Sequence, residues 1–328
     1  MKEPPLTTTP SLFPEPVVLD AERLSGKPVS LWRTTWRRFF QRRSALVGLA
    51  ILSVLVFTAI FAPLIAPYGP EQVLIGVEDV QRREPPCIHL LGCPQDRPQH
   101  LLGIDGNVRD MFSRMVYGSR FSLIIGFSTV SFAIVIGTFL GAIAGYLGGW
   151  VDNVIMRVMD VLLAFPALLL AIAIVAVIGP GLINALLAIA IVTIPAYARV
   201  MRASVLSIKE TNFVAASKAL GASPARVLLV SILPNAMTPL IVLGTLEVAS
   251  AILSAAALSF LGLGAQPPTP EWGSMLSAER NQVFTSPHLV FFPGLMITLT
   301  VLSFNLLGDG LRDALDPRLA RKGVGATL

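Results

Sequence analysis

The first residues that could support chemistry are the two cysteines of the chain. Cys87 and Cys93 lie six positions apart, with His89 between them and His100 a few residues later. In an oxidising compartment the two thiols could close a small disulfide loop. Free thiols are the second possibility, and a metal site is the third, which would need more ligands than His100 alone adds. We therefore expect a disulfide and no metal.

Glu247 is the one acidic residue that lies well inside a long apolar stretch. Because an unpaired carboxylate is costly to bury in lipid, its side chain should face a bundle interior, a partner subunit or a translocation path. A role in the substrate pathway and a role in structural pairing are both compatible with this position.

Four other residues near the ends of apolar stretches have polar or amphipathic side chains. Arg157 and Asp160 lie one helical turn apart near a helix start, and we expect an interfacial pair rather than a transport site. Tyr197 and Trp272 are expected to anchor their helices at a membrane interface.

Residues for nucleotide hydrolysis are absent from this sequence. A phosphate-binding loop G-x-x-x-x-G-K-[ST] needs a lysine followed by Ser or Thr, and no lysine here is followed by either. The run Gly262-Leu263-Gly264 is too short for a dinucleotide fingerprint. We expect no catalytic residues and no cofactor bound by this chain.

The composition of the 328-residue chain is typical of a membrane protein. It is 54% hydrophobic and 14% charged, whereas soluble chains carry about 25% charged residues. Burying so much apolar surface in water would need a larger core than this chain can enclose, so lipid is the expected solvent. The net charge of +5 does not indicate nucleic acid, because the arginines cluster beside apolar runs.

Six apolar windows of about 20 residues predict an all-α membrane protein with six transmembrane helices. Pro166 interrupts the third window and Pro195 the fourth, which is the weakest. Prolines are tolerated in spans where neighbouring helices satisfy the freed carbonyls, so we expect a packed bundle. The windows cover residues 44–65, 122–145, 155–178, 182–201, 237–261 and 289–307.

The second window carries Gly137, Gly141 and Gly145 on one helix face. Small residues at this spacing favour the close approach of another helix. The alternative is that glycine is simply common in membrane spans.

Basic residues predict the orientation of the chain. They cluster before the first window, between the fourth and fifth, and after the sixth. With six spans these segments share one side, which the positive-inside rule makes the cytoplasm, with both termini inside. The long first loop on the other side also holds arginines, but it is mixed with acidic residues and carries little weight.

The segment before the first window has two expected parts. Residues 1–26 are Pro-rich and are predicted to be disordered. After them Trp32, Trp36, Phe39 and Phe40 recur at helical spacing, which predicts an amphipathic helix in the cytoplasmic interface. A plain basic anchor is the alternative. The first apolar run is too long for a signal peptide, so we expect it to remain as an anchor.

The loop between the fourth and fifth windows is too polar to cross a membrane and too patterned to be disordered. A helix capped by Thr211 or Asn212 should end at Gly221. A second helix should open at Ser223 and stop at Pro234.

The first of these helices is expected to dock in a groove of a partner. Its small residues would let the groove close on the backbone, and its apolar residues would fill the groove. A hairpin that lies on the bilayer and binds nothing is the alternative. The docking residues would be Phe213, Val214, Ala215, Ala216, Ser217, Leu220 and Gly221.

The stretch FVAASKALG at 213–221, with ILP at 232–234, resembles the EAA loop of ABC importer permeases, the coupling helix that sits in a cleft of the ATPase subunit. The family's usual glutamate is Ala215 here and its second alanine is Ser217. The resemblance therefore implies docking by shape and apolar packing, without a charge at that position.

Other stretches are similar to one branch of that family, the dipeptide/oligopeptide permease subunit of the C type. The resemblance covers about residues 31–320, although Ile104 and Val108 replace the usual Thr and Gly. The matching stretches are HLLGID at 100–105, RD at 109–110, MRVMDVLLAFP at 156–166, LSFLGLG at 258–264, QPPTPEWG at 266–273 and GDGLRDALDPR at 308–318.

The resemblance implies a type I ABC importer permease fold in a bacterial or archaeal cytoplasmic membrane. It implies four kinds of partner: a homologous permease subunit that completes a heterodimer, two ATP-binding cassette subunits that use ATP and Mg²⁺, an extracytoplasmic solute-binding protein, and membrane lipid. Peptides are the implied cargo, and relatives also carry nickel complexes or oligosaccharides. An ion-coupled secondary transporter would need coupling residues at the bilayer midplane, where only Glu247 qualifies.

The expected organisation has six parts along the chain. They are a disordered segment 1–26, an interfacial helix 27–43, a first span 44–66, an extracytoplasmic loop 67–117, a permease core 118–309 that includes the coupling loop 205–235, and a cytoplasmic tail 310–328.

Overall fold

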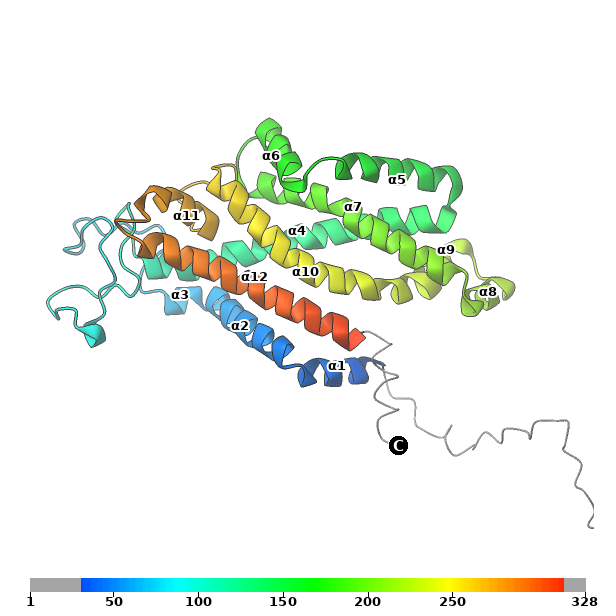
Figure 1. The fold of residues 1–328 in the computed structure, drawn as a ribbon, viewed down its shortest axis with the longest axis horizontal. Helices are drawn as coiled ribbons and strands as arrows, with labels where there is room; N and C mark the ends of the chain where they lie inside the picture. Colours follow the sequence, from blue (N-terminus) through cyan, green and yellow to red (C-terminus); the bar gives the residue numbers. More distant parts are fainter. Residues whose placement is uncertain (1–30, 316–328) are drawn as a thin grey trace, which may run out of the picture.

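The computed structural model describes residues 31–315 and shows a bundle of long helices (Figure 1). The segment predicted to be disordered, 1–26, and most of the predicted tail, 310–328, lie outside the described residues. Within 31–315 extended pairing is limited to three isolated bridges, so the all-α prediction is confirmed. The helices are α1 (Leu31–Gln41), α2 (Arg43–Ile60), α3 (Ala62–Ile65), α4 (Met111–Leu147), α5 (Gly149–Leu163), α6 (Ala167–Ile178), α7 (Leu182–Lys209), α8 (Asn212–Ala219), α9 (Pro224–Arg226), α10 (Leu233–Phe260), α11 (Trp272–Glu279) and α12 (His288–Leu315).

Five of the helical stretches in the described part are long and apolar enough to cross a membrane. The pair α5 and α6 makes a sixth span if the two cross together, but they are bent by 91°. The bend lies at Pro166, which is the N-cap residue of α6. Its ψ of 127° is not helical and its nitrogen carries no hydrogen, so α5 ends before it and a new helix begins after it. The six predicted windows therefore correspond to five continuous spans and one sharply broken pair.

The contact between α4 and α7 depends on the three glycines predicted to permit close approach. A Cβ added at Gly137 would collide with Tyr197, one at Gly141 with the Ala198 carbonyl, and one at Gly145 would lie 3.0 Å from the Arg202 carbonyl. Backbone meets backbone along this seam, so the prediction of tight packing is confirmed.

Pro234 does not stop a helix, so that prediction is wrong. The segment Val227–Ile232 is a π-helix that leads directly into α10, with Pro234 in its first turn. The Leu233 N–H donates to the Leu228 carbonyl, five residues back. This wider turn leaves room for the proline ring, so the fifth span begins near Pro224 rather than at residue 237.

Helix α12 lies between α2 and α10 (Figure 1). Gly48 of α2 packs against Ser303 and Leu306 of α12, and Gly308 of α12 packs against Leu246 of α10. At the C-terminal end of α12, Ala314 and the buried Phe39 of α1 belong to one apolar cluster.

Helix α1 occupies most of the predicted interfacial segment 27–43. Phe39 is buried, whereas Trp36 and Phe40 are 54% and 50% exposed. Arg42, just after α1, pairs with Asp313 of α12 at 3.4 Å. One face of α1 thus packs on the bundle and two aromatic rings stay outside it.

Two predictions about charged and aromatic residues are wrong. Asp160 pairs with Arg199 of α7 at 2.9 Å, and Arg157 makes no ion pair within residues 31–315. The close packing of α5 on α7 brings Arg199 to Asp160, which overrides the local spacing. Tyr197 and Trp272 are fully buried rather than interfacial, because helices cover them on all sides.

Candidate functional site

The predicted coupling loop is an ordered pair of turns around α8. Thr211 is the N-cap residue, but its hydroxyl donates to the Ile208 carbonyl at 2.6 Å instead of capping α8. Gly221 has φ +82°, the left-handed conformation that glycine adopts without strain, and its N–H donates to the Lys218 carbonyl. Ser223 caps the next helix by accepting the Arg226 N–H.

The side chains of α8 divide into a buried and an exposed set. Val214 is fully buried, packed in a cluster with Met201, Val205 and Val227. Phe213 is 48% exposed and Leu220 is 89% exposed. The expectation that Val214 helps to fill a partner's groove is therefore wrong, because that side chain faces the bundle and fixes α8 in place.

The rest of the predicted docking set lies on the outer face. Ala215, Ala216 and Gly221 are exposed, and Ser217 is partly exposed. A Cβ added at Gly221 would meet nothing within 4 Å, so the outer surface here is free of bulk from this chain. Such a surface, with two apolar side chains beside bare backbone, is suited to insertion into a groove.

The loop is also attached to α4. The Lys209 ammonium, at the end of α7, donates to the Tyr146 carbonyl of α4 at 2.9 Å. This contact and the Val214 cluster attach the α8 segment to α4 and α7.

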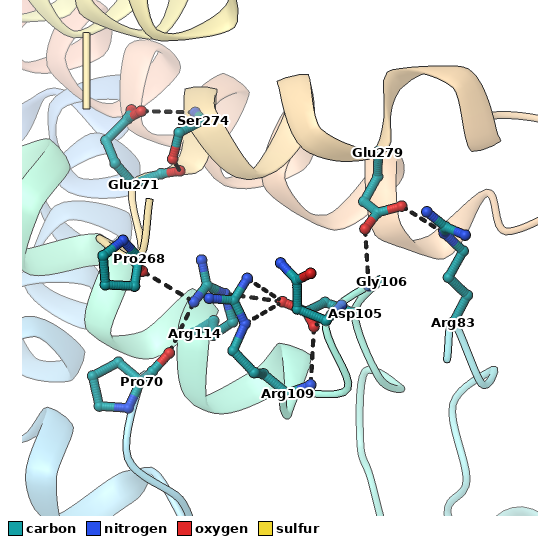
Figure 2. Close-up of polar contacts among 11 residues, drawn as sticks. Pro70, Arg83, Asp105, Gly106, Arg109, Arg114, Pro268, Glu271, Ser274 and Glu279 are labelled. Atoms are coloured by element: carbon teal, nitrogen blue, oxygen red, sulfur yellow. Dashed lines mark hydrogen bonds and ion pairs between the residues drawn. The ribbon is translucent and has the colours of Figure 1, made fainter. Parts of the chain in front are cut away.

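At the other end of the bundle, Asp105 organises the long first loop (Figure 2). Its carboxylate accepts the N–H groups of Asn107 and Arg109, at 2.8 and 2.9 Å, and the Arg109 Nε at 2.8 Å. The Arg114 guanidinium lies 3.4 Å from Asp105 and donates to the carbonyls of Pro70 and Pro268. One carboxylate and two arginines thus join the first loop, α4 and the segment before α11.

Glu279 and Trp272 attach the two ends of α11 to that loop and to α4. The Glu279 carboxylate accepts the Gly106 N–H at 2.9 Å and the Arg83 Nε at 2.8 Å (Figure 2). The Trp272 indole donates to the Met115 carbonyl at 3.1 Å. Glu271 caps α11 by accepting two backbone N–H groups, and burial raises the pKa of its carboxyl.

A second network of side-chain hydrogen bonds connects the first loop to the start of α4. The buried His100 imidazole bonds Asp110 at 2.8 Å and Glu78 at 3.0 Å, and the Tyr68 hydroxyl donates to Glu78 at 2.6 Å. Asp110 also caps α4 by accepting the Ser113 N–H. Burial alone would lower the pKa of His100, but the bonds to the two carboxylates outweigh it and raise that pKa.

The structure joins Cys87 and Cys93 in a disulfide, with Cα atoms 5.4 Å apart. The backbones of Cys87 and His100 exchange two hydrogen bonds, so the disulfide loop is connected to the hydrogen-bond network around His100. The His89 ring bonds the Arg97 carbonyl. No group of His, Cys, Asp and Glu within residues 31–315 is arranged to hold a metal ion.

Sequence reasoning missed the role of this polar cluster. Arg83 and Glu279 are 196 positions apart, so nothing local in the sequence connects them. The stretches around His100, Asp105 and Asp110 did carry a signal, but only as family motifs without a role.

Glu247 lies at the middle of α10, on a partly exposed face. It takes no part in either polar cluster or in the coupling loop.

These features define a multi-pass membrane protein with an ordered helical loop around α8 at one end. At the other end lies a polar platform, which consists of the hydrogen-bonded clusters around Asp105 and His100. Two family models match the chain: residues 137–321 match the binding-protein-dependent transport system inner membrane component, and residues 30–86 match the N-terminal TM domain of oligopeptide transport permease C. The chain belongs to the family of binding-protein-dependent transport system inner membrane components, and is a permease subunit of the ABC importer class.

Relatives match over most of the chain. It is 47% identical over 291 residues to the dipeptide transport system permease protein DppC of Alkalihalophilus pseudofirmus, covering 89% of this chain and 91% of the relative. It is 48% identical to the di/tripeptide transport system permease protein DppC of Pseudomonas aeruginosa, covering 87% and 91%. It is 46% identical to the glutathione transport system permease protein GsiD of Escherichia coli, covering 88% and 91%.

A solved structure shares the fold. A chain of the MetNI methionine ABC transporter, in an inward-facing conformation, aligns with a TM-score of 0.51 and 20% identity, covering 63% of this chain and 98% of that chain. The predicted permease fold is confirmed.

Proposed function

We propose that this chain forms half of the translocation pathway of an ATP-driven importer of short peptides, and that separate ATPase subunits drive it through α8. The observation that carries the proposal is the exposed outer face of α8. Phe213 in α8 and Leu220 just after it are exposed, whereas Val214 is buried and packs α8 against the bundle. A groove in a partner would bury these two apolar side chains and close on the small residues between them.

The proposed orientation places α8 and both termini in the cytoplasm and the first loop outside. Two features support it. The basic segments flank α8 and the chain ends, as the positive-inside rule requires. The disulfide lies in the first loop, at the opposite end of the bundle, which suits an oxidising exterior.

The proposed assembly contains a homologous permease subunit, two ATP-binding cassette subunits that use ATP and Mg²⁺, and an external solute-binding protein. The absence of a phosphate-binding lysine motif from the sequence supports a separate ATPase. The bent α5–α6 pair leaves large apolar side chains exposed, among them Val161, Phe165 and Leu169, which supports burial against lipid or a second permease subunit.

The proposed cargo is a di- or oligopeptide. The relatives at 46–48% identity are named for dipeptide, di/tripeptide and glutathione transport, and all three cargoes are small peptides. Nickel complexes and oligosaccharides are the alternative cargoes.

Reconstituted vesicles test the function. The complex of permeases, ATPases and binding protein should take up labelled dipeptide only with ATP and Mg²⁺ present, and dissipating the ion gradients should leave the rate unchanged. Uptake that persists without ATP but collapses with the gradients would refute the proposal. Mass spectrometry of the solute held by the purified binding protein distinguishes peptide from nickel complex or oligosaccharide.

A further inference from the structure

One face of α10 carries a polar stripe at the depth where a membrane span is normally apolar. Glu247 lies at the centre of the helix, and Ser250 and Ser254 follow it at three and seven positions, on the same face. Ser250 is exposed, while Glu247 and Ser254 are partly exposed.

The faces of α10 on either side of the stripe pack against other helices. Gly244 lies against Ile134 and Val130 of α4, and Leu246 contacts Gly308 of α12. The stripe lies between these two contacts, at the edge of the packed surface, and Ser250 is its exposed member.

Within the described residues the Glu247 carboxylate has no cation to pair with. Glu247 makes no ion pair within residues 31–315. The sequence has no Lys, Arg or His between Arg226 and Arg280, so α10 itself supplies none. Because lipid is a poor solvent for this group, we expect the stripe to face water or a cation from outside the described residues.

We propose that Glu247 binds the α-ammonium group of the peptide cargo in the translocation pathway, with Ser250 and Ser254 lining the same path. The inference rests on the proposed peptide import. An α-amino group has a pKa of about 8, so peptides with a free N-terminus present mainly a cation at neutral pH whatever their side chains. A single carboxylate at mid-span can therefore recognise peptides of unrelated sequence by the feature that they share.

A cysteine scan tests the location. Both native cysteines form the disulfide, so Ser250→Cys adds the one free thiol to the described chain and keeps the Glu247 carboxylate. In the complete complex, with cysteine-free partner subunits, a water-soluble methanethiosulfonate should label this thiol during turnover, and saturating dipeptide should slow the labelling several-fold. Thr245→Cys is the control, because Thr245 points to a different side of α10. Equal labelling at both positions, or no protection by dipeptide, would overturn the location.

A charge comparison tests the ligand. Wild type and Glu247→Gln would each transport a dipeptide and its N-acetyl derivative, both presented as preformed complexes with the binding protein at saturating concentration. The selectivity of the binding protein is the same in both complexes and so cancels from the ratio of the two rates. Loss of the charge pair should reduce the preference for the free amine by about tenfold or more, as expected for a charged hydrogen bond. Thr245→Val should leave the ratio at the wild-type value.

Three outcomes are distinct. If Glu247→Gln has a lower ratio of free-amine to N-acetyl uptake than wild type, the result supports ammonium binding by Glu247. An unchanged ratio with both rates lowered overturns it and points to pairing with a basic residue of the second permease subunit. If wild type transports neither peptide in the presence of ATP, the proposed peptide import fails instead.

Discussion

Leu220→Ala should weaken the association of the permease with its ATPase without affecting the fold. Leu220 is 89% exposed in the free chain, so nearly all of its side chain is available for burial on docking. Replacing it with alanine removes three carbon atoms, each of which contributes about 0.8 kcal/mol when buried. We expect a loss of about 2 kcal/mol, or about thirtyfold in Kd.

Val214→Ala is the matched comparison, because Val214 is an apolar side chain of the same loop that faces inward. It should lower the free energy of unfolding by about 2–3 kcal/mol, from lost burial and a small cavity, while folded protein binds the ATPase almost normally. Biolayer interferometry of permease in nanodiscs against purified ATPase gives Kd, and scanning fluorimetry gives the melting temperature. Wild-type affinity in Leu220→Ala would refute the reasoning, since the exposed side chain would then bury nothing on docking.

Three further predictions concern the bundle and the polar platform. Gly141→Ala should destabilise the protein by about 1–3 kcal/mol in thermal melting, because its Cβ would meet the backbone of α7, whereas Gly294→Ala should be tolerated, since the nearest atom lies 3.8 Å from the new Cβ. The folded pKa of His100 is raised, so its charged form stabilises the first loop fully below its ordinary pKa of 6.5. The melting temperature should therefore fall as the pH rises above about 6.5 and through the folded pKa, and His100→Asn should remove this slope. Replacing both Cys87 and Cys93 with serine should cost about 2 kcal/mol of stability, measured by chemical denaturation, while ATP-driven uptake persists.

The spans were predictable because lipid imposes a simple requirement on the sequence. An apolar run of about 20 residues can satisfy its backbone only as a helix, whatever surrounds it. The glycine seam of α4 was predictable for a similar reason, since the spacing alone places all three glycines on one face. These inferences need no knowledge of neighbouring elements.

The extent of α4 could not be read from hydropathy. The predicted window began at residue 122, yet the helix begins at Met111. Its first turns contain Arg114 and Arg120, which lower the hydropathy. Arg120 donates to the carbonyls of Ala59 and Ile60 at the end of α2, so a segment distant in sequence accepts the hydrogen bonds of this guanidinium.

The errors at Tyr197, Trp272 and Asp160 have one physical cause. Each prediction assumed that a side chain meets its immediate sequence neighbours or the membrane interface. In the fold, α4 covers Tyr197, and the Met115 carbonyl accepts a hydrogen bond from the Trp272 indole. Asp160 pairs with Arg199 of the neighbouring helix α7. Tertiary contacts of this kind have no local sequence signal.

Helix α4 is a continuous rod of 37 residues, or about 55 Å at 1.5 Å per residue. A bilayer with its headgroups is about 40–45 Å thick, so the rod is longer than the membrane. Its first residue follows Asp110 in the platform, and near its last turn the Tyr146 carbonyl holds the lysine that precedes α8. A strut of this length cannot shorten without breaking hydrogen bonds. If α4 tilts at one side of the membrane, its other end therefore moves at the same time, because no flexible segment interrupts the helix.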